Sequence, residues 1–388
     1  MKFHNSEILE DPYPHYQKWR KDSPIWWAED VGGWVLSRYD DVRAILKDAV
    51  LFSSKAMGEG DQQAIALPLL TDDPPRHTQL RAIVNKAFTS RTLKDMEIEV
   101  AKLVEELLDR MAGKTVIDIS GQFTIPLPVY IISRLMGIPE ERADDFKRWS
   151  DALTGTSEAT NLEDRMPDIM EMANYFASLI PERRKHPGDD LISKVVQAEV
   201  DGEGISDQDI VGFNMLLLIA GNETTTNLLS NLLNHLAAHP ETWKELRENL
   251  DKVEAAVEET LRFDAPVHWV NRKATADTEF HGQKVKAGDT VYAILGSANR
   301  DSEHYENADE FRLDRVRGVD HHTFGRGIHA CIGAPLARME ARFALKGLFR
   351  RYKTICHPEH AENERTHSSM LRGFHHLWLE VEPAKETN

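Results

Sequence analysis

The stretch that most constrains this chain of 388 residues runs from Phe324 to Gly333. It contains Cys331, one of only two cysteines in the sequence, among closely spaced glycines. Glycine lets a backbone turn tightly and approach another group closely. After the cysteine, apolar residues recur at helical spacing, and Pro335 is compatible with the first turn of a helix. We therefore expect Cys331 to lie where a glycine-rich loop enters a helix.

A cysteine at the start of a helix has its own chemistry, because unpaired amides and the positive end of the helix dipole favour a thiolate. Such a thiolate, with the flat Phe324 beside it, suits axial ligation of haem iron. Most free cysteines are small buried hydrophobic residues, but the glycine density argues against that here. A zinc site with His321, His322 and His329 fails on spacing, because no second Cys-x-x-Cys or His-x-x-x-His element accompanies it.

The same segment resembles the haem-ligand signature of the cytochrome P450 family, Phe-x-x-Gly-x-x-x-Cys-x-Gly, and every signature position matches. This family is itself the known example of haem ligation by a cysteine thiolate. The resemblance implies that Cys331 is the axial ligand of haem b. It assigns further cofactor contacts in this loop to Phe324, Gly325, His329 and Gly333.

A second group of residues has side chains suited to binding carboxylates. His77 and Arg81 are four residues apart, so they share one face of a helix expected to start after residues 72–75. Such a pair usually belongs to a solvated surface. In the family, residues at this place bond a haem propionate, and Arg272 and His329 match two further propionate contacts. The two propionates would be buried anions, and buried anions need hydrogen-bond donors or cations as partners. Four potential cations are enough to meet that need.

A long helix is expected from about Asp207 to His239, and its middle reads Ala220-Gly221-Asn222-Glu223-Thr224-Thr225. Glycine inside a helix costs about 1 kcal/mol relative to alanine, so it calls for a reason. The alanine and the glycine would let a flat cofactor approach, and Thr224 can hydrogen-bond the Ala220 carbonyl. Packing of helices across small residues is the alternative. The string matches the family's oxygen-activation motif, which implies that Glu223 and Thr224 manage protons and water where O2 binds.

Glu259 and Arg262 are spaced to share one helix face, which alone is a common surface feature. In order with the other motifs they match the family's Glu-x-x-Arg pair, which supports the haem loop from behind. The family often adds an arginine from a later Pro-x-Arg-Phe segment, but the matching position here is the acidic Glu310. Arg312 and Arg315 are both candidates for completing this network.

The resemblance also indicates which segments face the substrate. Residues 51–73 show little periodicity and correspond to the loop that closes over substrate, with Ile65 and Leu67 among its apolar residues. The segment before Arg272 supplies the other expected pocket residues, which are Val267, Trp269 and Val270. His268 lies among them, and a structural hydrogen-bonding role is the favoured interpretation for it. Another pocket loop is expected near residues 371–373.

The remaining patterns indicate a mainly α fold with a small β region. Helices are expected near residues 39–47, 92–112 and 125–136, and two more between Pro240 and Phe263. Residues 140–185 are expected to be mostly helical, and the resemblance implies that their polar, irregular stretch from about Thr154 to Met166 lies between two helices. Short strands are expected near residues 24–27, 33–37, 267–270, 281–285 and 290–293. No linker, repeat or low-complexity tract marks a boundary. We therefore expect one cytochrome P450 haem domain over residues 1–388, without a fused reductase and with haem between the long helix and the Cys331 loop.

The composition of the chain indicates which classes of binding partner to expect. The formal net charge is −17, from 47 Lys and Arg against 64 Asp and Glu, which argues against nucleic acid. Two distant cysteines form no disulfide framework, so a reducing cytoplasm is expected. The N-terminus does not read as a signal peptide, and the longest apolar run is too short for the ~20 residues that span a bilayer. Membrane insertion is therefore not expected.

The resemblance implies a monooxygenase that inserts one atom of O2 into an apolar small molecule, by hydroxylation or epoxidation. Its electrons would come ultimately from NAD(P)H, through a separate ferredoxin or flavodoxin-type donor. A basic stripe on the helix after Cys331 would guide an acidic donor together with Arg326, or would be a solvated face; it consists of Arg338, Arg342, Lys346 and Arg350. A peroxide-driven enzyme is disfavoured because Glu223 and Thr224 are both kept, and a non-enzymatic haem sensor because the catalytic set is complete.

Overall fold

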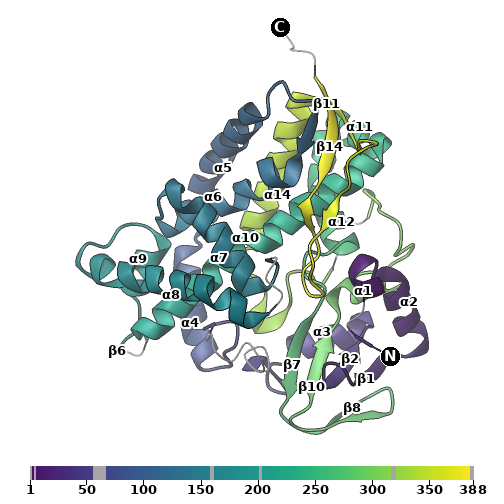
Figure 1. The fold of residues 1–388 in the computed structure, drawn as a ribbon. Coiled ribbons are helices and arrows are strands. Elements are labelled where there is room, and N and C mark those ends of the chain that lie inside the picture. Colours follow the sequence, from purple (N-terminus) through teal and green to yellow (C-terminus); the bar gives the residue numbers. More distant parts are fainter. Residues whose placement is uncertain are drawn as a thin grey trace.

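The computed structural model describes residues 2–3, 6–55, 67–157, 161–200, 203–315 and 320–384, and most of them are helical (Figure 1). The longer helices are α2 (Tyr13–Asp22), α3 (Tyr39–Lys47), α4 (Arg76–Ala87), α5 (Ser90–Arg110), α6 (Pro126–Met136), α7 (Ala143–Thr154), α8 (Leu162–Lys185), α10 (Asp207–Ala238), α11 (Pro240–Glu248), α12 (Val253–Phe263) and α14 (Ala334–Arg351). Shorter ones are α1 (Ser6–Glu10), α9 (Leu191–Val196) and α13 (Leu295–Ala298). The expected mainly α fold with a small β region is confirmed.

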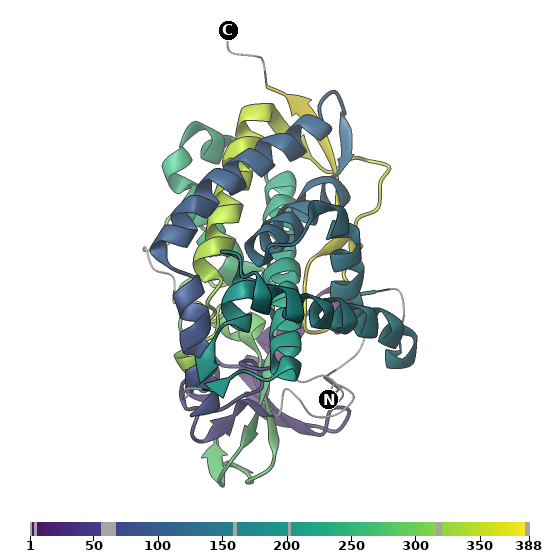
Figure 2. The same cartoon turned by 90° about the vertical axis from the view of Figure 1, so that its left-hand side faces the viewer.

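Helix α10 is the centre of the helical part. It runs through the middle of the molecule in Figure 2 and packs against α6, α7, α8, α12 and α14. Its start is capped by Ser206, whose Oγ accepts a hydrogen bond from the Asp209 amide at 3.1 Å. Most of its side chains are buried, as expected for a helix surrounded by others.

Two large apolar clusters meet α10 on its two halves. Residues 210–218 belong to a cluster with side chains of α6, α7, α8 and α9. Residues 228–237 belong to a second cluster, with side chains of α5, α12 and α14. The segment from Ala220 to Thr225 lies between these two cores, so the packing of both halves sets its position.

A five-stranded sheet lies at one end of the molecule, beside α1, α2 and α3 (Figure 1). Its strands, in spatial order, are β1 (Ile25–Ala28), β2 (Gly33–Leu36), β10 (Thr290–Ala293), β7 (Val270–Ala274) and β3 (Phe52–Ser53). Strands β1 and β2 pair antiparallel, and β10 pairs parallel with β2 and antiparallel with β7. This pairing brings the N-terminal strands beside residues that follow them by about 250 positions in the sequence and fixes Arg272 opposite Val291.

The other strands form smaller sheets. β11 (Tyr352–Cys356), β14 (Trp378–Pro383) and β4 (Val116–Asp118) make a three-stranded sheet in that spatial order. Three pairs complete the β structure: β5 (Glu199–Val200) with β6 (Glu203–Gly204), β8 (Thr278–Phe280) with β9 (Gln283–Val285), and β12 (Glu364–Arg365) with β13 (Phe374–His376).

Several expected boundaries differ from the observed ones. The strand expected at 267–270 is wrong, because β7 begins only at Val270 and Val267 makes a single bridge to Leu371. The helical region expected at 140–185 is divided at the expected irregular stretch, because Gly155 adopts a φ of +73° and ends α7, but α8 begins at Leu162 rather than after Met166. Residues 56–66, which include Ile65 of the expected substrate loop, lie outside the described residues. Within the described ranges, no helix is both long and apolar enough to cross a membrane.

Candidate functional site

The Cys331 loop enters α14 as expected from the sequence. Helix α14 begins at Ala334 with Pro335 in its first turn, three residues after the cysteine. The Cys331 amide donates a hydrogen bond to the Phe324 carbonyl at 2.8 Å, which closes the loop on itself. The cysteine therefore projects from a short closed loop at a helix start.

Two glycines are required for the shape of this loop. Gly325 and Gly327 have φ values of +63° and +66°, in the left-handed region that other residues adopt at a cost. A Cβ on Gly327 would also lie 2.8 Å from the Leu46 carbonyl oxygen at the end of α3. The loop is thus pressed against α3 as well as connected to α14.

The ionisation of Cys331 is set by two opposing effects. Its side chain has solvent-accessible surface, but many protein atoms surround it and displace bulk water. The resulting desolvation raises the pKa of the thiol. The amides of Gly333 and Ala334 lower that pKa, in the direction expected for a helix start, as does the charge of Arg81. The helix start therefore favours the thiolate as expected, but burial outweighs the amides, and the net pKa of the thiol is raised. A metal cation would reverse the balance, since coordination deprotonates a thiol.

On α10, the residues of the expected oxygen-activation motif are more accessible than their neighbours. Ala220 is exposed, and Gly221 and Thr224 are half-buried, within a helix that is otherwise mostly buried. Thr224 Oγ1 donates to the Ala220 carbonyl at 2.8 Å, which confirms the expected bond. A Cβ on Gly221 would lie 2.9 Å from Ile132 Cδ1 on α6, so close helix packing also explains this glycine.

Glu223 lies within the interior and connects α10 to α7. Its carboxylate is buried, and Oε1 lies 3.3 Å from each of three donors: Lys147 Nζ, Ser150 Oγ and Asn222 Nδ2. Burial raises the pKa of Glu223 to about 7, although Lys147 acts to lower it. The ammonium of Lys147 also pairs with Asp151 on the same helix. Glu223 is therefore a buried acid with a cationic partner near the surface of α7.

The sequence interpretation did not identify these partners of Glu223. Lys147, Ser150 and Asp151 are three and four residues apart, which places them on one face of a helix. That spacing was the available signal, but it does not reveal which distant helix the face meets.

The four cations expected at the haem propionates come together from three parts of the chain. His77 and Arg81 lie on α4, Arg272 on β7 and His329 beside Cys331. The His77 and His329 rings are 4.2 Å apart between centroids, and Arg81 Nη2 donates to the Ala330 carbonyl at 2.5 Å. Burial and then Arg272 lower the pKa of His329 to about 3, and burial lowers that of Arg272 to about 10.

This cluster of two guanidinium and two imidazole groups fits a group with two carboxylates. His77 is buried, and no described residue makes a hydrogen bond with either of its ring nitrogens. Buried polar atoms are normally paired, and buried guanidinium groups are stabilised by an anion. An accessible thiol, an accessible patch on α10 and this buried set of donors are features that haem requires.

The Glu259–Arg262 pair forms the expected network, and the structure identifies its third member. Arg262 Nε and Nη2 donate to the two Glu259 oxygens at 2.8 and 2.7 Å, with both side chains fully buried. Arg315 Nε donates to Glu259 Oε1 at 2.9 Å, so Arg315 completes the network. Arg312 contributes only its backbone amide, at 2.9 Å, because its side chain pairs with Asp314.

Asn299 joins this network to the haem loop. Arg262 Nη1 donates to the Asn299 carbonyl at 2.9 Å. The Asn299 amide side chain in turn donates to Thr323 Oγ1 at 2.9 Å and accepts from the His322 amide at 2.7 Å. His322 and Thr323, directly before Phe324, are therefore hydrogen-bonded to the Glu259–Arg262 network through Asn299.

The expected substrate-pocket residues have different surroundings. Leu67 is half-buried against the cluster that contains the first half of α10, and Val267 and Val270 are half-buried against the core of the five-stranded sheet. Trp269 packs on Phe3 and Tyr292, with ring centroids 5.6 and 5.4 Å away. Because that packing accounts for the indole, its pocket role stays a prediction.

His268 has the structural role that the sequence favoured. It is buried, and its Nδ1 lies 2.9 Å from the Tyr16 hydroxyl. Burial lowers the pKa of His268 to about 3, so the imidazole is neutral at physiological pH.

Comparisons with known proteins agree with this site. A family model described as Cytochrome P450 matches residues 16–375 of the chain. The chain is similar to the putative cytochrome P450 YjiB of Bacillus subtilis (strain 168), with 40% identity over 351 residues. That alignment covers 89% of this chain and 88% of the relative.

Solved structures give the same result. PksS, the bacillaene polyketide synthase cytochrome P450 of Bacillus subtilis 168, has a TM-score of 0.91 at 35% identity, over 98% of this chain and 100% of that one. CYP109E1 from Bacillus megaterium, solved with testosterone, has a TM-score of 0.85 at 37% identity, over 95% and 99%. The chain is therefore similar to these two proteins in both sequence and fold over almost its whole length. The chain therefore belongs to the cytochrome P450 family and is a haem-thiolate monooxygenase.

Proposed function

We propose that this enzyme inserts one atom of O2 into an apolar small molecule of about steroid size, by hydroxylation or epoxidation. The observation that carries the proposal is the accessible thiol of Cys331 at a helix start, next to Arg81 and to the contacting rings of His77 and His329. CYP109E1 structures contain testosterone and corticosterone, which supports the substrate class for a chain 37% identical to that protein.

In this proposal, the described residues hold haem b in a single haem domain. Cys331 is the axial ligand, and the side chains that bond the propionates are those of His77, Arg81, Arg272 and His329. The residues that approach the flat faces of the cofactor are Ala220, Gly221, Phe324, Gly325 and Gly333. Haem, when bound, supplies the activation of O2 and the transfer of oxygen.

Glu223 and Thr224 divide the handling of protons between them. The Thr224 hydroxyl is oriented by its bond to the Ala220 carbonyl, and its oxygen can accept a hydrogen bond from water. Glu223 is buried and has a pKa of about 7, near the operating pH that suits a general acid. Lys147 connects it to Asp151, and each of these side chains is about one-fifth exposed. We infer that protons pass from solvent through this pair to Glu223, and then to water beside Thr224.

Replacing Lys147 by methionine is expected to shift the pH dependence of product formation. In the parent, proton delivery declines as pH rises through about 7, because Glu223 loses its proton. The Lys147 cation lowers that pKa, so Lys147→Met raises it and moves the decline upward by about one pH unit. The rate of product formation measured from pH 6 to 9 tests this shift. Lys244→Met, on the surface of α11, is the matched control and should leave the profile in place.

The electron donor is proposed to be an acidic iron–sulfur protein or flavodoxin that receives its electrons from NAD(P)H and docks near α14. Much of the predicted basic stripe is engaged: Arg338 donates to both Glu258 oxygens, Arg350 pairs with Glu105 and Arg326 pairs with Asp320. Exposed ion pairs are weak but partly neutralise each charge. Lys346 is exposed and Arg342 half-buried, and we assign the steering to these two.

The double substitution Arg342→Glu and Lys346→Glu is therefore expected to slow reduction by such a donor about tenfold at low salt, and much less at high salt. Stopped-flow reduction at increasing ionic strength measures the effect. Lys185→Glu, at the end of α8, makes the same kind of charge change elsewhere. If the double variant and this control lowered the rate equally, the docking assignment would be wrong.

A turnover comparison tests the proposed function itself. With NAD(P)H, a donor protein and O2, the enzyme should convert a steroid-sized apolar compound chosen by a spectral shift on binding. Peroxide alone should support much slower conversion, because Glu223 and Thr224 serve proton delivery to O2-derived oxygen. Faster product formation with peroxide than with O2 and the donor would assign the chain a peroxide-driven reaction instead.

A further inference from the structure

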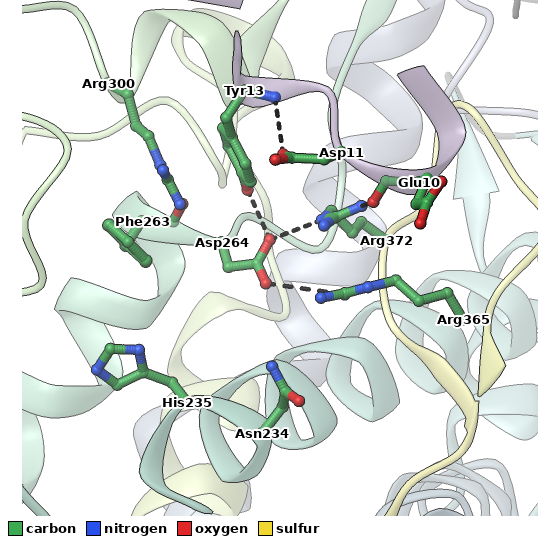
Figure 3. Close-up of a pocket in the computed structure, with 10 residues that line it drawn as sticks. All are labelled: Glu10, Asp11, Tyr13, Asn234, His235, Phe263, Asp264, Arg300, Arg365 and Arg372. Atoms are coloured by element: carbon green, nitrogen blue, oxygen red, sulfur yellow. Dashed lines mark hydrogen bonds and ion pairs between the residues drawn. The ribbon is translucent and has the colours of Figure 1, made fainter. Parts of the chain in front are cut away.

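A pocket of about 350 Å3 lies where the N-terminal helices meet the ends of α10 and α12 (Figure 3). Tyr13 comes from the start of α2, Asn234 from the last turn of α10 and Asp264 from the end of α12. None of its lining residues belongs to the proposed haem site. Its volume lies within the range of small-molecule sites.

The one deeply placed carboxylate of this pocket is already paired. Asp264 Oδ1 accepts from the Tyr13 hydroxyl at 2.6 Å and from Arg372 Nε at 2.9 Å. Although burial raises the pKa of Asp264, Arg372 and then Arg365 hold it well below its usual range. Asp264 and Arg372 therefore neutralise each other inside the protein.

Two further guanidinium groups form only long ion pairs with carboxylates, beyond hydrogen-bond distance, although Arg300 Nε donates to the Phe263 carbonyl at 2.7 Å. Arg365 Nη1 is 3.9 Å from Asp264, and no described residue makes a hydrogen bond with this buried nitrogen. Arg300 Nη1 is 3.8 Å from Asp309, an exposed residue. Arg300 lies between the rings of Tyr13 and Phe263, 3.4 and 3.5 Å from their centroids, so its position is rigidly set.

We propose that this pocket binds a small organic molecule through a carboxylate or phosphate group held by Arg300 and Arg365. Planar guanidinium groups match the oxygens of such anions, and their hydrogen bonds to anions are among the strong ones. His235 adds no charge at neutral pH, because burial and then His239 lower its pKa to about 4. The exposed Glu10 and Asp11 stand at the rim and disfavour large polyanions, so the site selects a single small oxyanion group.

The pocket lies beside residues that connect α10 to two other segments of the chain, so a bound ligand should affect the stability of the enzyme. The Arg372 amide donates to the Pro266 carbonyl at 2.9 Å, and Val267 bridges Leu371. Asn231 Nδ2 on α10 donates to the carbonyls of both Asp264 and Arg372, at 3.0 and 2.9 Å. A ligand held beside these residues would strengthen the junction of α10 with both segments, so it should also stabilise the folded enzyme.

Calorimetric titration of the holoenzyme with inorganic phosphate, and separately with succinate, tests the site at constant ionic strength. At least one of the two should bind, with one site per chain, and should raise the melting temperature above that in chloride. Arg365→Gln should weaken binding about tenfold or more, because it removes a charge-assisted hydrogen bond. The matched control is Arg43→Gln, an exposed arginine on α3 that also pairs with a carboxylate, and it should leave binding unchanged.

A second variant is expected to bind the anion more tightly, which misfolding could not explain. Glu10→Gln removes a rim carboxylate and should tighten binding about twofold to fivefold. The stronger of the two probes identifies the anionic group, whether carboxylate or phosphate. Failure of both probes to bind the parent, or equal affinity of the parent and the folded Arg365→Gln variant, would refute the proposal. Neither outcome would alter the turnover expected at the haem site.

Discussion

The Cys331→Ser variant is expected to lose the far-red-shifted absorption band of the reduced carbon-monoxide complex, together with nearly all product formation. Serine retains the size of the side chain, but it cannot provide the thiolate that produces this band and pushes electron density toward the bound ligand. The measurement is a difference spectrum of the reduced protein with and without carbon monoxide. Product formation should fall by orders of magnitude, because oxygen cleavage depends on that electron density.

Cys356→Ser is the matched control for this result. Cys356 is half-buried at the end of β11, and burial raises the pKa of its thiol, as it does for Cys331. It differs in having no glycine-rich loop or helix start beside it. Its variant should keep both the band and the activity. Loss of the band in Cys356→Ser and its retention in Cys331→Ser would transfer the ligand role to the other cysteine.

Thr224→Ala is expected to separate electron consumption from product formation. The variant should still bind haem and substrate and still consume O2, since Thr224 supports neither the fold nor the cluster of guanidinium and imidazole groups. Much of the flux should emerge as hydrogen peroxide, because the hydroxyl oriented by the Ala220 carbonyl no longer holds the water that receives protons. Product formed per electron pair should fall about tenfold or more, because a positioned proton donor contributes roughly a hundredfold or more to a rate.

Two further variants distinguish the role of Thr224 from the roles of its neighbours on α10. Thr226 lies two residues farther along α10, is buried and bonds Asn222 rather than the accessible patch, so Thr226→Ala should stay coupled. Glu223→Gln should slow turnover and increase the solvent isotope effect, because it removes the buried proton source. Full coupling in Thr224→Ala would leave the α10 motif with a packing role alone.

The features that the sequence predicted well are those encoded by neighbouring residues. The loop around Cys331 and the start of α14 depend on closely spaced glycines and Pro335, and the Thr224 bond reaches only one helical turn back. Spacing of this kind is readable because helix geometry relates the residues directly. Family resemblance then placed the distant cations His77 and Arg272 at one site, although nothing in their own spacing indicates it.

Features that depend on packing between distant segments were not predictable in the same way. The link from Glu223 to Lys147 joins two residues that are 76 positions apart in the sequence. The choice of Arg315 over Arg312 depends on how one loop folds around Glu259. Desolvation of the Cys331 thiol has the same origin, which is why the local argument gave the effect of the helix start but not the larger, opposing effect of burial. The strand expected at 267–270 failed because Val267 pairs with a loop residue near the C-terminus.

The hydrogen bonds behind the haem loop have a consequence for how the cofactor is acquired. Arg262, Asn299 and Thr323 connect the loop to α12 through protein atoms only, and Gly327 is pressed against the end of α3. These bonds do not involve the cofactor, so we expect them to hold the ligand loop in shape before haem arrives. Loss of haem would then remove a partner from Cys331 without removing any of these bonds. We therefore expect the apoprotein to keep its ligand in register and to take up haem by docking rather than by folding of this loop.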